Sequence, residues 1–249
     1  MEAVRESAPG TLSVLVLTRD RPDYFAACSA ALACSEAPPT LERIVVQHGH
    51  DAATLAIAER DGWLVLSPGR NQSFSVGNNQ AARAAHGDYL LLLNNDAEVE
   101  PFTIAAMWAR RAARLVGSLS VHPVGRVVTH HGGVFTADGV PIHEGRGQKR
   151  PEEYTSDLPA SWVTFACALV ERRLWVELGG LDESYFYAYE DVDFCLRAAE
   201  LGVSPVVAFD ARVLHPELGT RTGVEDRPNF EIYTDRWVST GRLSRALHR

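Results

Sequence analysis

The chain has no hydrophobic run long enough to cross a membrane as a helix, and its first ten residues, "MEAVRESAPG", contain no apolar signal segment. We therefore expect a soluble protein of the cytoplasm. Cysteine is scarce: the four thiols form no CxxC pair and no dense framework, which predicts reduced and mostly buried side chains. An excess of basic residues is also absent. A formal net charge of −8 argues against nucleic-acid binding, although local charge still permits a small anionic ligand.

The remaining composition, 46% hydrophobic and 22% charged over 249 residues, is that of an ordinary globular protein. In the first half, short apolar runs alternate with helix-like stretches. Strands are predicted at Leu12–Leu17, Arg43–Gln47, Trp63–Ser67 and from Tyr89, and helices at Pro22–Cys34, Asp51–Gly62, about Gly77–His86 and from Pro101. This alternation predicts a parallel sheet covered by helices on both faces, with ligands bound at the carboxyl ends of the strands.

The second half of the chain lacks the regular alternation of strands and helices. Residues 118–160 are rich in Gly, His and Pro, which indicates short antiparallel strands and a long, mobile loop from about Ala137 to Ala160. A strand is predicted at Ser161–Val170. An aromatic run then leads into a helix from about Glu190 to Leu201. No linker separates two independent domains, so we expect one domain.

The strand "YLLLL" runs into Asn94, Asn95 and Asp96. A carboxylate beside two amides at a strand end can hold Mg²⁺ or Mn²⁺, since hard cations take oxygen ligands. The alternative is an Asx-turn, in which these side chains bond the local backbone. Taken alone, the motif favours the turn.

The stretch "EDVD", Glu190 to Asp193, carries three carboxylates in four residues. Acids at a helix N-terminus favour the macrodipole, and Asp193 can pair with Arg197 one turn later. The functional interpretation makes one acid a general base, because the preceding aromatic residues would pack against a sugar ring. Taken alone, the structural interpretation is favoured.

Two further signals are weak. A helix beginning at Gly77, with Arg70 nearby, would offer backbone N–H groups to an anion, but a loop with a capping glycine explains the same residues. The histidines have no recognised ligand spacing, so a structural role is favoured for each of them. They include His48, His50, His130, His131, His143 and His215.

The order of these motifs resembles that of the family 2 inverting glycosyltransferases, in particular the bacterial rhamnosyltransferase-like branch. "GNN" precedes "NND", "GGLDE" precedes "EDVD", and a late histidine follows, from about Leu12 to Trp237. The resemblance implies an α/β GT-A fold: a Rossmann-like, mostly parallel central sheet flanked by helices, with a smaller mixed sheet on the acceptor side. It implies a nucleotide-sugar-binding half at about residues 11–116, an acceptor half at about 117–227, and a C-terminal helix at 228–249.

The resemblance also implies roles for particular residues. Asn94, Asn95 and Asp96 correspond to a DXD-type motif, with Asp96 as the direct ligand of Mn²⁺ or Mg²⁺. Asp191 corresponds to the catalytic base with Glu190 as its neighbour. His215 matches an additional metal ligand in some relatives. The residues expected at the nucleotide, its ribose or its diphosphate are Thr18, Arg19, Gln47, Asn71 and Asn78.

Two departures from the family pattern concern specificity. Gln47 stands where relatives usually have an Asp that accepts from the base, so a preference for a uracil or thymine nucleotide, UDP or dTDP, does not follow. Phe165-Ala166 stands where relatives usually have Gly-Ala, and a phenyl ring there would narrow the sugar site or give it a stacking face. Trp162 and Tyr189 complete the expected sugar pocket.

The implied reaction moves a sugar from a nucleotide-diphosphate donor to a hydroxyl of a glycan, a lipid-linked saccharide or a small natural product. The loop from Ala137 to Ala160 would close over the donor. The rival hypothesis, motivated by Gln47 and Phe165, is a non-catalytic module that binds nucleotide sugars. A nucleotidyltransferase is disfavoured because "LTRDRPDY" is not a glycine-rich loop.

The last residues, "DRWVSTGRLSRALHR", carry four arginines after a single acid. They are compatible with peripheral contact at the inner face of a membrane. A solvated terminal helix is the favoured alternative, because the apolar face is thin. The sequence indicates no oligomeric state.

Overall fold

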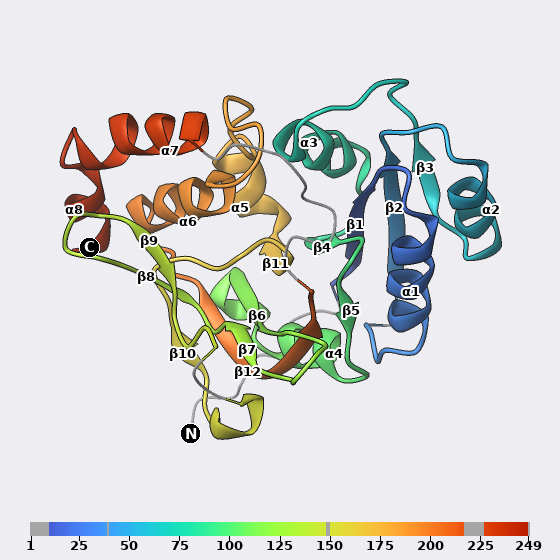
Figure 1. The fold of residues 1–249 in the computed structure, drawn as a ribbon, viewed down its shortest axis with the longest axis horizontal. Coiled ribbons are helices and arrows are strands. Elements are labelled where there is room, and N and C mark those ends of the chain that lie inside the picture. Colours follow the sequence, from blue (N-terminus) through green and yellow to red (C-terminus); the bar gives the residue numbers. More distant parts are fainter. Residues whose placement is uncertain (1–9, 39, 148–149, 217–226, 249) are drawn as a thin grey trace.

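The computed structural model describes residues 10–38, 40–147, 150–216 and 227–248 as an α/β fold around a large central sheet (Figure 1). In the described residues the main path of this sheet has the order β10-β12-β6-β11-β4-β1-β2-β3, with β5 paired to β12 and β7 to β6. A second, small sheet is formed by β8 and β9. The predicted α/β class with a second small sheet is confirmed.

The strands and helices are short to medium in length. The strands are β1 Leu12–Thr18, β2 Leu41–Gln47, β3 Leu64–Leu66, β4 Tyr89–Asn94, β5 Glu98–Val99, β6 Leu115–Val121, β7 Val128–His130, β8 Gly133–Phe135, β9 Pro141–His143, β10 Leu158–Pro159, β11 Cys167–Glu171 and β12 Val206–Leu214. The α-helices are α1 Pro22–Ala33, α2 Ala52–Arg60, α3 Phe74–Ala84, α4 Thr103–Ala109, α5 Arg172–Glu177, α6 Glu190–Glu200, α7 Arg227–Tyr233 and α8 Arg242–Leu247. The short turns of helix are η1 Arg111–Ala113, η2 Pro151–Glu153 and η3 Thr234–Val238.

The directions of the strands place the carboxyl ends of several of them at one edge of the sheet. β3, β2, β1 and β4 are parallel, as predicted, and Thr18 pairs with Gln47 at their carboxyl ends. β11 is antiparallel to both β4 and β6, and β12 is parallel to β6. Because two reversals cancel, β4, β6 and β12 all end at the same edge. The residues that follow β4 and β12 therefore meet there.

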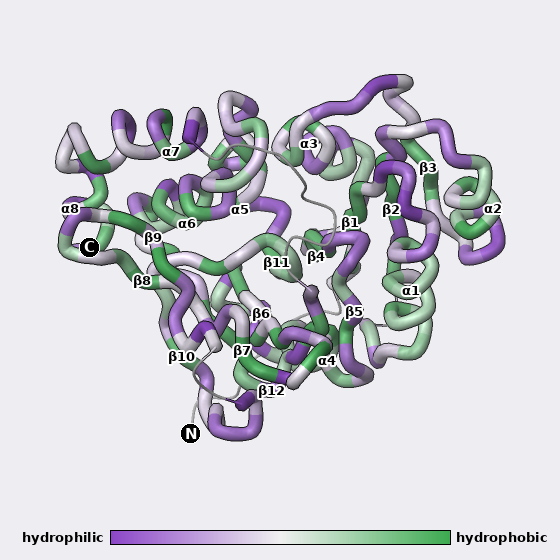
Figure 2. Tube along the Cα trace, viewed as in Figure 1, coloured by the Kyte–Doolittle hydropathy of each residue, from purple (hydrophilic) through white to green (hydrophobic). Residues whose placement is uncertain are grey.

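The four leucines of β4 explain why this strand is apolar throughout. Leu90 and Leu92 belong to a core cluster with α3, α5 and α6, whereas Leu91 and Leu93 belong to a second cluster with α1, α2 and α4. The strand is thus buried on both faces, which removes the usual alternation of polar and apolar residues. In Figure 2 the central strands carry hydrophobic stretches, and polar residues gather on outer turns and helices.

The predicted start of α3 at Gly77 is wrong. The helix begins at Phe74, because the Ser73 hydroxyl caps it by accepting from the Val76 N–H at 3.1 Å. The Gly77 N–H donates to the Ser73 carbonyl and is not available to an anion. A glycine is required here for a different reason: a Cβ would lie 2.6 Å from Leu17 Cδ2 and 2.9 Å from His48 Nε2.

The second half also differs from the prediction. The expected loop at Ala137–Ala160 contains β9, which forms a hairpin with β8, and β10, which pairs with β12, so the interpretation as a structureless loop is wrong. The expected strand at Ser161–Val170 begins only at Cys167. The helix expected from Pro101 is shorter and spans Thr103–Ala109. The short antiparallel strands expected in this region are present as β7, β8 and β9.

The C-terminal segment packs on α6 as two helices joined by η3. The predicted single helix is broken at Gly241, which has φ of 63°. Tyr233 and Trp237 are fully buried, and the Tyr233 hydroxyl donates to the Gly139 carbonyl at 2.7 Å. In the part of the chain that the structure describes, no helix combines the length and hydropathy needed to cross a bilayer.

Candidate active site

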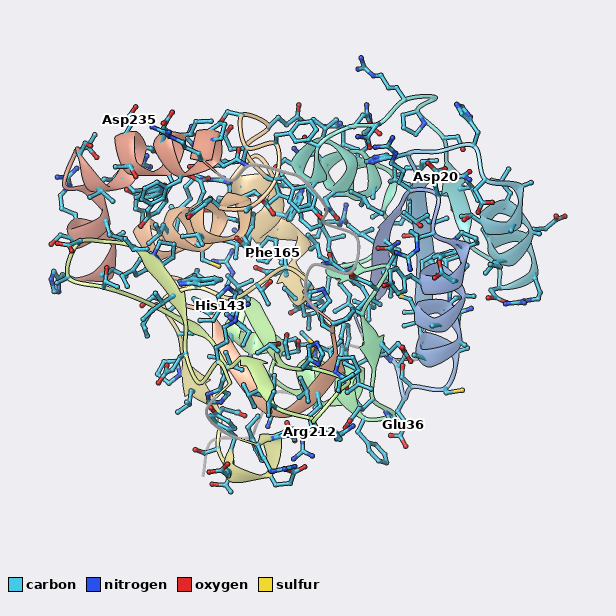
Figure 3. The ribbon with its side chains drawn as sticks, viewed as in Figure 1. Asp20, Glu36, His143, Phe165, Arg212 and Asp235 are labelled. Atoms are coloured by element: carbon cyan, nitrogen blue, oxygen red, sulfur yellow. The ribbon has the colours of Figure 1, made fainter. Side chains whose placement is uncertain are left out.

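A cavity of about 410 Å³ opens at the shared edge of the sheet. Its lining comes from the turn after β4, the ends of β6 and β12, strands β7 and β9, the segment 162–165 and the start of α6. Phe165 and His143, from two of these segments, both lie near the middle of the molecule (Figure 3). Residues far apart in the sequence therefore share one site.

Asp96 and His215 meet at one end of this cavity. Asp96 follows β4 in a turn closed by the Ala97 N–H and the Asn94 carbonyl, at 3.1 Å, and its side chain is 3% exposed. His215 follows β12, and its Nε2 lies 3.2 Å from Asp96 Oδ1 and 3.4 Å from Asn94 Nδ2. The turn is closed by backbone groups, and the side chains of Asn94 and Asn95 contact His215 and Thr18, so these contacts are not those of an Asx-turn. Metal binding by Asp96 stays a prediction.

The donors at this end suit a divalent cation. Asp96 Oδ1 is buried and accepts no well-aligned hydrogen bond. A carboxylate oxygen beside an imidazole nitrogen suits Mn²⁺, and Mg²⁺ is commonly held by one or two carboxylates together with substrate phosphates. The residues that the structure describes contain no group of three His, Cys, Asp or Glu side chains suited to a metal. Asp96 and His215 therefore fit a metal whose remaining ligands come from substrate and water.

Three of the residues expected at the nucleotide, Thr18, Arg19 and Gln47, lie at the ends of β1 and β2 and outside the lining of the cavity. Asn95 turns away from Asp96 and donates to the Thr18 hydroxyl at 3.1 Å. Gln47 is buried, and its Nε2 donates to the Asp51 carbonyl at 2.7 Å. Arg19 is exposed beside Asp20 at 3.6 Å. Asn95 and Gln47 thus stabilise this edge, and Arg19 is the accessible cation on it.

The asparagines around α3 have different environments. Asn71 is exposed in the loop before the helix. Asn78 is buried and donates to the Phe74 carbonyl of its own helix at 3.0 Å. Asn79 reaches the segment "GGLDE": it donates to the Leu181 carbonyl at 2.8 Å and accepts from the Leu181 N–H at 2.9 Å. "GNN" and "GGLDE" are therefore coupled by a structural contact, and neither asparagine of α3 lines the cavity.

The three acids of "EDVD" point in different directions. Glu190 and Asp191 line the cavity at the first turn of α6. Asp191 Oδ1 accepts from the Val192 N–H at 2.8 Å, within its own helix. Asp193 is fully buried and pairs with Arg197 at 2.7 Å, as predicted. The structural interpretation thus holds for Asp193, whereas a general base at the cavity end of the motif stays a prediction.

The backbone before α6 is strained at the cavity. Ala188 and Tyr189 have φ of 74° and 69°, in the left-handed region that costs a non-glycine residue about 1–2 kcal/mol each. Both residues line the cavity. Stacking holds the turn in place, since the Tyr189 ring lies 5.4 Å from that of Tyr233. This conformation turns the first residues of α6 toward the site.

The opposite wall contains residues that the sequence did not single out. Of the expected sugar-pocket residues, Trp162, Phe165 and Tyr189 line the cavity, whereas Ala166 does not. The additional lining residues with chemistry are Ser120, Thr129, His130, His143, Thr164 and Arg146. They come from short strands and turns with no ligand spacing, and the register of Ser120 opposite His130 brings them together only in the folded chain.

Burial keeps the histidines of this wall neutral. It lowers the pKa of His130 well below its usual value, with a further contribution from His143. Burial, then the nearby Arg146 and His215, lower the pKa of His143 to about 4. The Trp162 ring lies about 5 Å from both imidazoles, at 5.0 Å and 4.9 Å. At neutral pH this wall therefore presents uncharged imidazoles.

The fold is that of known glycosyltransferases. The chain superposes on the mannosyltransferase PcManGT from Pyrobaculum calidifontis in complex with GDP-Man and Mn²⁺ with a TM-score of 0.64 and 16% identity, covering 86% of this chain and 59% of that one. At this level of identity the likeness shows the fold alone, and it is the GT-A-like architecture that the sequence predicted.

Sequence comparison shows the family. The chain is 30% identical over 255 residues to the O-antigen biosynthesis protein RfbC of Myxococcus xanthus, covering 95% of this chain and 19% of that protein. It is 31% identical over 147 residues to the N-acetylglucosaminyl-diphospho-decaprenol L-rhamnosyltransferase of Mycobacterium tuberculosis, covering 51% of this chain and 47% of that protein. The chain thus spans half or less of these curated relatives. Residues 13–173 match the model of glycosyl transferase family 2, and the chain belongs to that family.

Proposed function

We propose that the protein is a metal-dependent, inverting glycosyltransferase that moves a hexosyl or deoxyhexosyl group from a nucleotide-diphosphate sugar to an acceptor hydroxyl. One observation carries the proposal: Asp96, His215 and Asp191, from three distant segments, line the same cavity. The first two suit a metal and a diphosphate, and the third suits a base. The family and the fold support the same chemistry.

In the proposed reaction Asp191 takes the proton of the acceptor hydroxyl as its oxygen bonds to C1 of the donor sugar. The bond from C1 to the diphosphate oxygen breaks on the opposite face, and the electron pair leaves with the nucleoside diphosphate. One displacement inverts the anomeric centre. Glu190 lies beside Asp191 on the cavity wall. In the proposed reaction its negative charge favours transfer of the hydroxyl proton to Asp191.

Asp96 and His215 would hold the Mn²⁺ or Mg²⁺, with Asn94 beside them. When bound, the cation would stabilise the charge that builds on the diphosphate. PcManGT is described with GDP-Man and Mn²⁺, which supports a nucleotide sugar and a divalent cation for this chain as well. We propose that the nucleotide lies along the ends of β1 and β2, near Thr18, Arg19 and Gln47.

The nucleobase of the donor can be uracil, thymine or guanine. Gln47 uses its amide N–H on Asp51, so its carbonyl oxygen is the group left to accept from a base N–H. That arrangement suits a uracil or thymine N3–H as well as a guanine N1–H. A thermal-shift screen of nucleoside diphosphates with Mn²⁺ decides between these bases.

The test is turnover by the purified chain with UDP-, dTDP- and GDP-sugars, with and without Mn²⁺ or Mg²⁺. Asp191→Asn is expected to lower kcat by about 10²–10⁴, the usual contribution of general-base catalysis. Asp96→Ala is expected to abolish the response to metal. Glu98→Ala is the matched control, because Glu98 is an exposed acid two residues away that does not line the cavity. If Asp191→Asn and Asp96→Ala transfer sugar at the wild-type rate, the assigned roles are wrong.

The rival function is a non-catalytic module that binds nucleotide sugars. Phe165 favours it, because this buried ring lines the cavity where relatives usually have the small Gly. The module hypothesis expects nucleotide binding by calorimetry and no release of nucleoside diphosphate with any acceptor. Product analysis by NMR would establish both transfer and the anomeric configuration.

We also propose that the protein is located in the cytoplasm. A separate hypothesis is that its C-terminal segment contacts the membrane surface. Two of its arginines have internal partners: Arg236 contacts Asp182 at 2.5 Å, and Arg242 contacts Glu200 at 2.6 Å. These contacts favour packing on the protein over contact with lipid. Flotation with anionic liposomes, compared between the full chain and a chain that lacks α8, tests the membrane hypothesis.

A further inference from the structure

One wall of the cavity, formed by the end of β6 and by β7, contains two buried hydroxyls that have no hydrogen-bond partner among the described residues. Ser120, at the end of β6, is 1% exposed, and Thr129, in β7, is 5% exposed. Within the part of the chain that the structure describes, neither Ser120 Oγ nor Thr129 Oγ1 makes a hydrogen bond, and both residues line the cavity. Since buried polar groups in native proteins are almost always paired, two adjacent exceptions at a cavity indicate a ligand that supplies the partners.

A neighbouring pair of histidines has its proton positions fixed by the backbone. The Thr164 N–H donates to His130 Nε2 at 3.2 Å, so this nitrogen must accept. The proton of neutral His130 is then on Nδ1, which donates to His143 Nδ1 at 2.9 Å. His143 in turn carries its proton on Nε2. A residue of the cavity wall is thereby set as a hydrogen-bond donor.

The buried polar side chains of this wall are uncharged. Ser120 and Thr129 are neutral at any ordinary pH, and burial keeps His130 and His143 unprotonated at neutral pH. Arg146 also lines the cavity and carries a positive charge, but it is exposed in the turn after β9, whereas the two hydroxyls are buried. Hydroxyls that both donate and accept, beside a fixed imidazole donor, match the hydroxyl groups of a neutral sugar better than a phosphate or a carboxylate.

We propose that Ser120, Thr129 and His143 form the binding site for the ring hydroxyls of a neutral acceptor sugar. The role as acceptor site rests on the proposed transferase function, because that function assigns the other end of the cavity to the donor diphosphate. The transferase reaction alone allows any compound with a hydroxyl group as the acceptor. The structure narrows this range to acceptors whose terminal group is a neutral sugar.

The experiment is a binding titration of the full chain with methyl glycosides of glucose, galactose, mannose, rhamnose and N-acetylglucosamine, followed by saturation-transfer NMR. Ser120→Ala and Thr129→Val remove one hydroxyl each with little change in shape. Thr129→Ser restores a hydroxyl. Ser118→Ala is the matched control: Ser118 is a buried serine of the same strand whose hydroxyl donates to the Cys167 carbonyl at 3.1 Å, and it does not line the cavity.

At least one glycoside is expected to bind the wild type. Its Kd is expected to rise about 5- to 10-fold in Ser120→Ala and in Thr129→Val, as for the loss of one hydrogen bond, and to stay unchanged in Ser118→Ala and near wild type in Thr129→Ser. The inference is overturned if no glycoside binds, or if Ser120→Ala and Thr129→Val bind as the wild type does. Because the titration needs no turnover, a failure of the proposed transfer activity would be seen separately, in the donor assay.

Discussion

Asp193 separates the structural acid of "EDVD" from Asp191, the acid that we propose as the general base. It is fully buried two residues after Asp191, and its carboxylate holds α6 to the C-terminal segment. Arg197 Nε donates to Oδ2 at 2.7 Å, while Arg236 Nη1 and Trp237 Nε1 donate to Oδ1 at 3.0 Å and 2.8 Å. The perturbation is Asp193→Asn, which preserves shape and removes the charge.

The expected cost follows from these contacts. The amide oxygen of an asparagine can still accept from Trp237, but its NH₂ group must face the Arg197 donor. Arg197 loses its charged partner, whereas Arg236 loses one of two and keeps Asp182. Charge-assisted hydrogen bonds contribute about 1.5–3 kcal/mol each, and breaking a buried ion pair costs about 3–5 kcal/mol. We therefore expect a loss of about 3 kcal/mol in the free energy of unfolding, or about 6–12 °C in Tm for a domain of this size.

Urea unfolding followed by tryptophan fluorescence measures this cost, and Trp237 reports on the site directly. Asp191→Asn is the comparison, because Asp191 lines the cavity at the first turn of α6 and is only half-buried. It is expected to stay within about 0.5 kcal/mol of wild type. The reasoning is refuted if Asp193→Asn unfolds like the wild type, or if Asp191→Asn is the more destabilised of the two.

Three further predictions concern stability. Asn79→Ala removes a buried amide that holds Leu181 at 2.8 Å and 2.9 Å, so urea unfolding should show a loss of about 2–3 kcal/mol; a loss under about 1 kcal/mol would contradict the coupling of "GNN" to "GGLDE". Gly133→Ala would bring a Cβ within 1.9 Å of Trp162 Cε2, so thermal unfolding should show a cost of about 1–3 kcal/mol with altered indole fluorescence, and unchanged fluorescence would count against it. The hydrogen bond from Arg60 lowers the pKa of Asp61 to about 2, below its ordinary value of 3.8. Because a depressed pKa stabilises the fold above the unfolded value, wild type should exceed Asp61→Asn by about 1 kcal/mol, after allowance for solvent screening, from pH 7 to 5, and this advantage should fade as the pH drops from about 4 to 2. A difference that is constant over this range would contradict the assignment.

The parallel half of the fold was predictable because its rules are local. Leu90 to Leu93 are apolar at every position, which occurs when both faces of a strand are covered, and the helices between the strands have visible caps such as Asp51. The start of α3 was missed because Ser73, two residues after Asn71, competes with Gly77 as a boundary signal. Gly77 is required because Leu17 packs closely against it. From the sequence alone, such a glycine cannot be distinguished from one that caps a helix.

The residues of the candidate site also divide into those that local sequence patterns indicate and those that they do not. Asp96 and Asp191 have recognisable neighbours in the sequence, and the rule that ligands bind at the carboxyl ends of parallel strands directs attention to Asp96. The Asn94 and Asn95 side chains could not be separated by sequence: the former lies 3.4 Å from His215, and the latter bonds Thr18. Adjacent residues in a turn point to different sides, and only the backbone angles decide which.

The neutral wall could not be predicted, because strand direction creates it. Ser120 reaches the catalytic edge only because β11 reverses between β4 and β6, and the two reversals restore the direction of the sheet. His130 then arrives opposite Ser120 through an irregular antiparallel pairing, and His143 through a hairpin of three-residue strands. Such short strands have too few residues to show a period in the sequence. The end of the cavity that contains Asp96, where we propose that the diphosphate binds, is thus encoded by a contiguous motif, whereas the half that we assign to the acceptor depends on tertiary register. This arrangement allows the acceptor wall to change by single substitutions without disturbing the end of the cavity that holds Asp96 and His215.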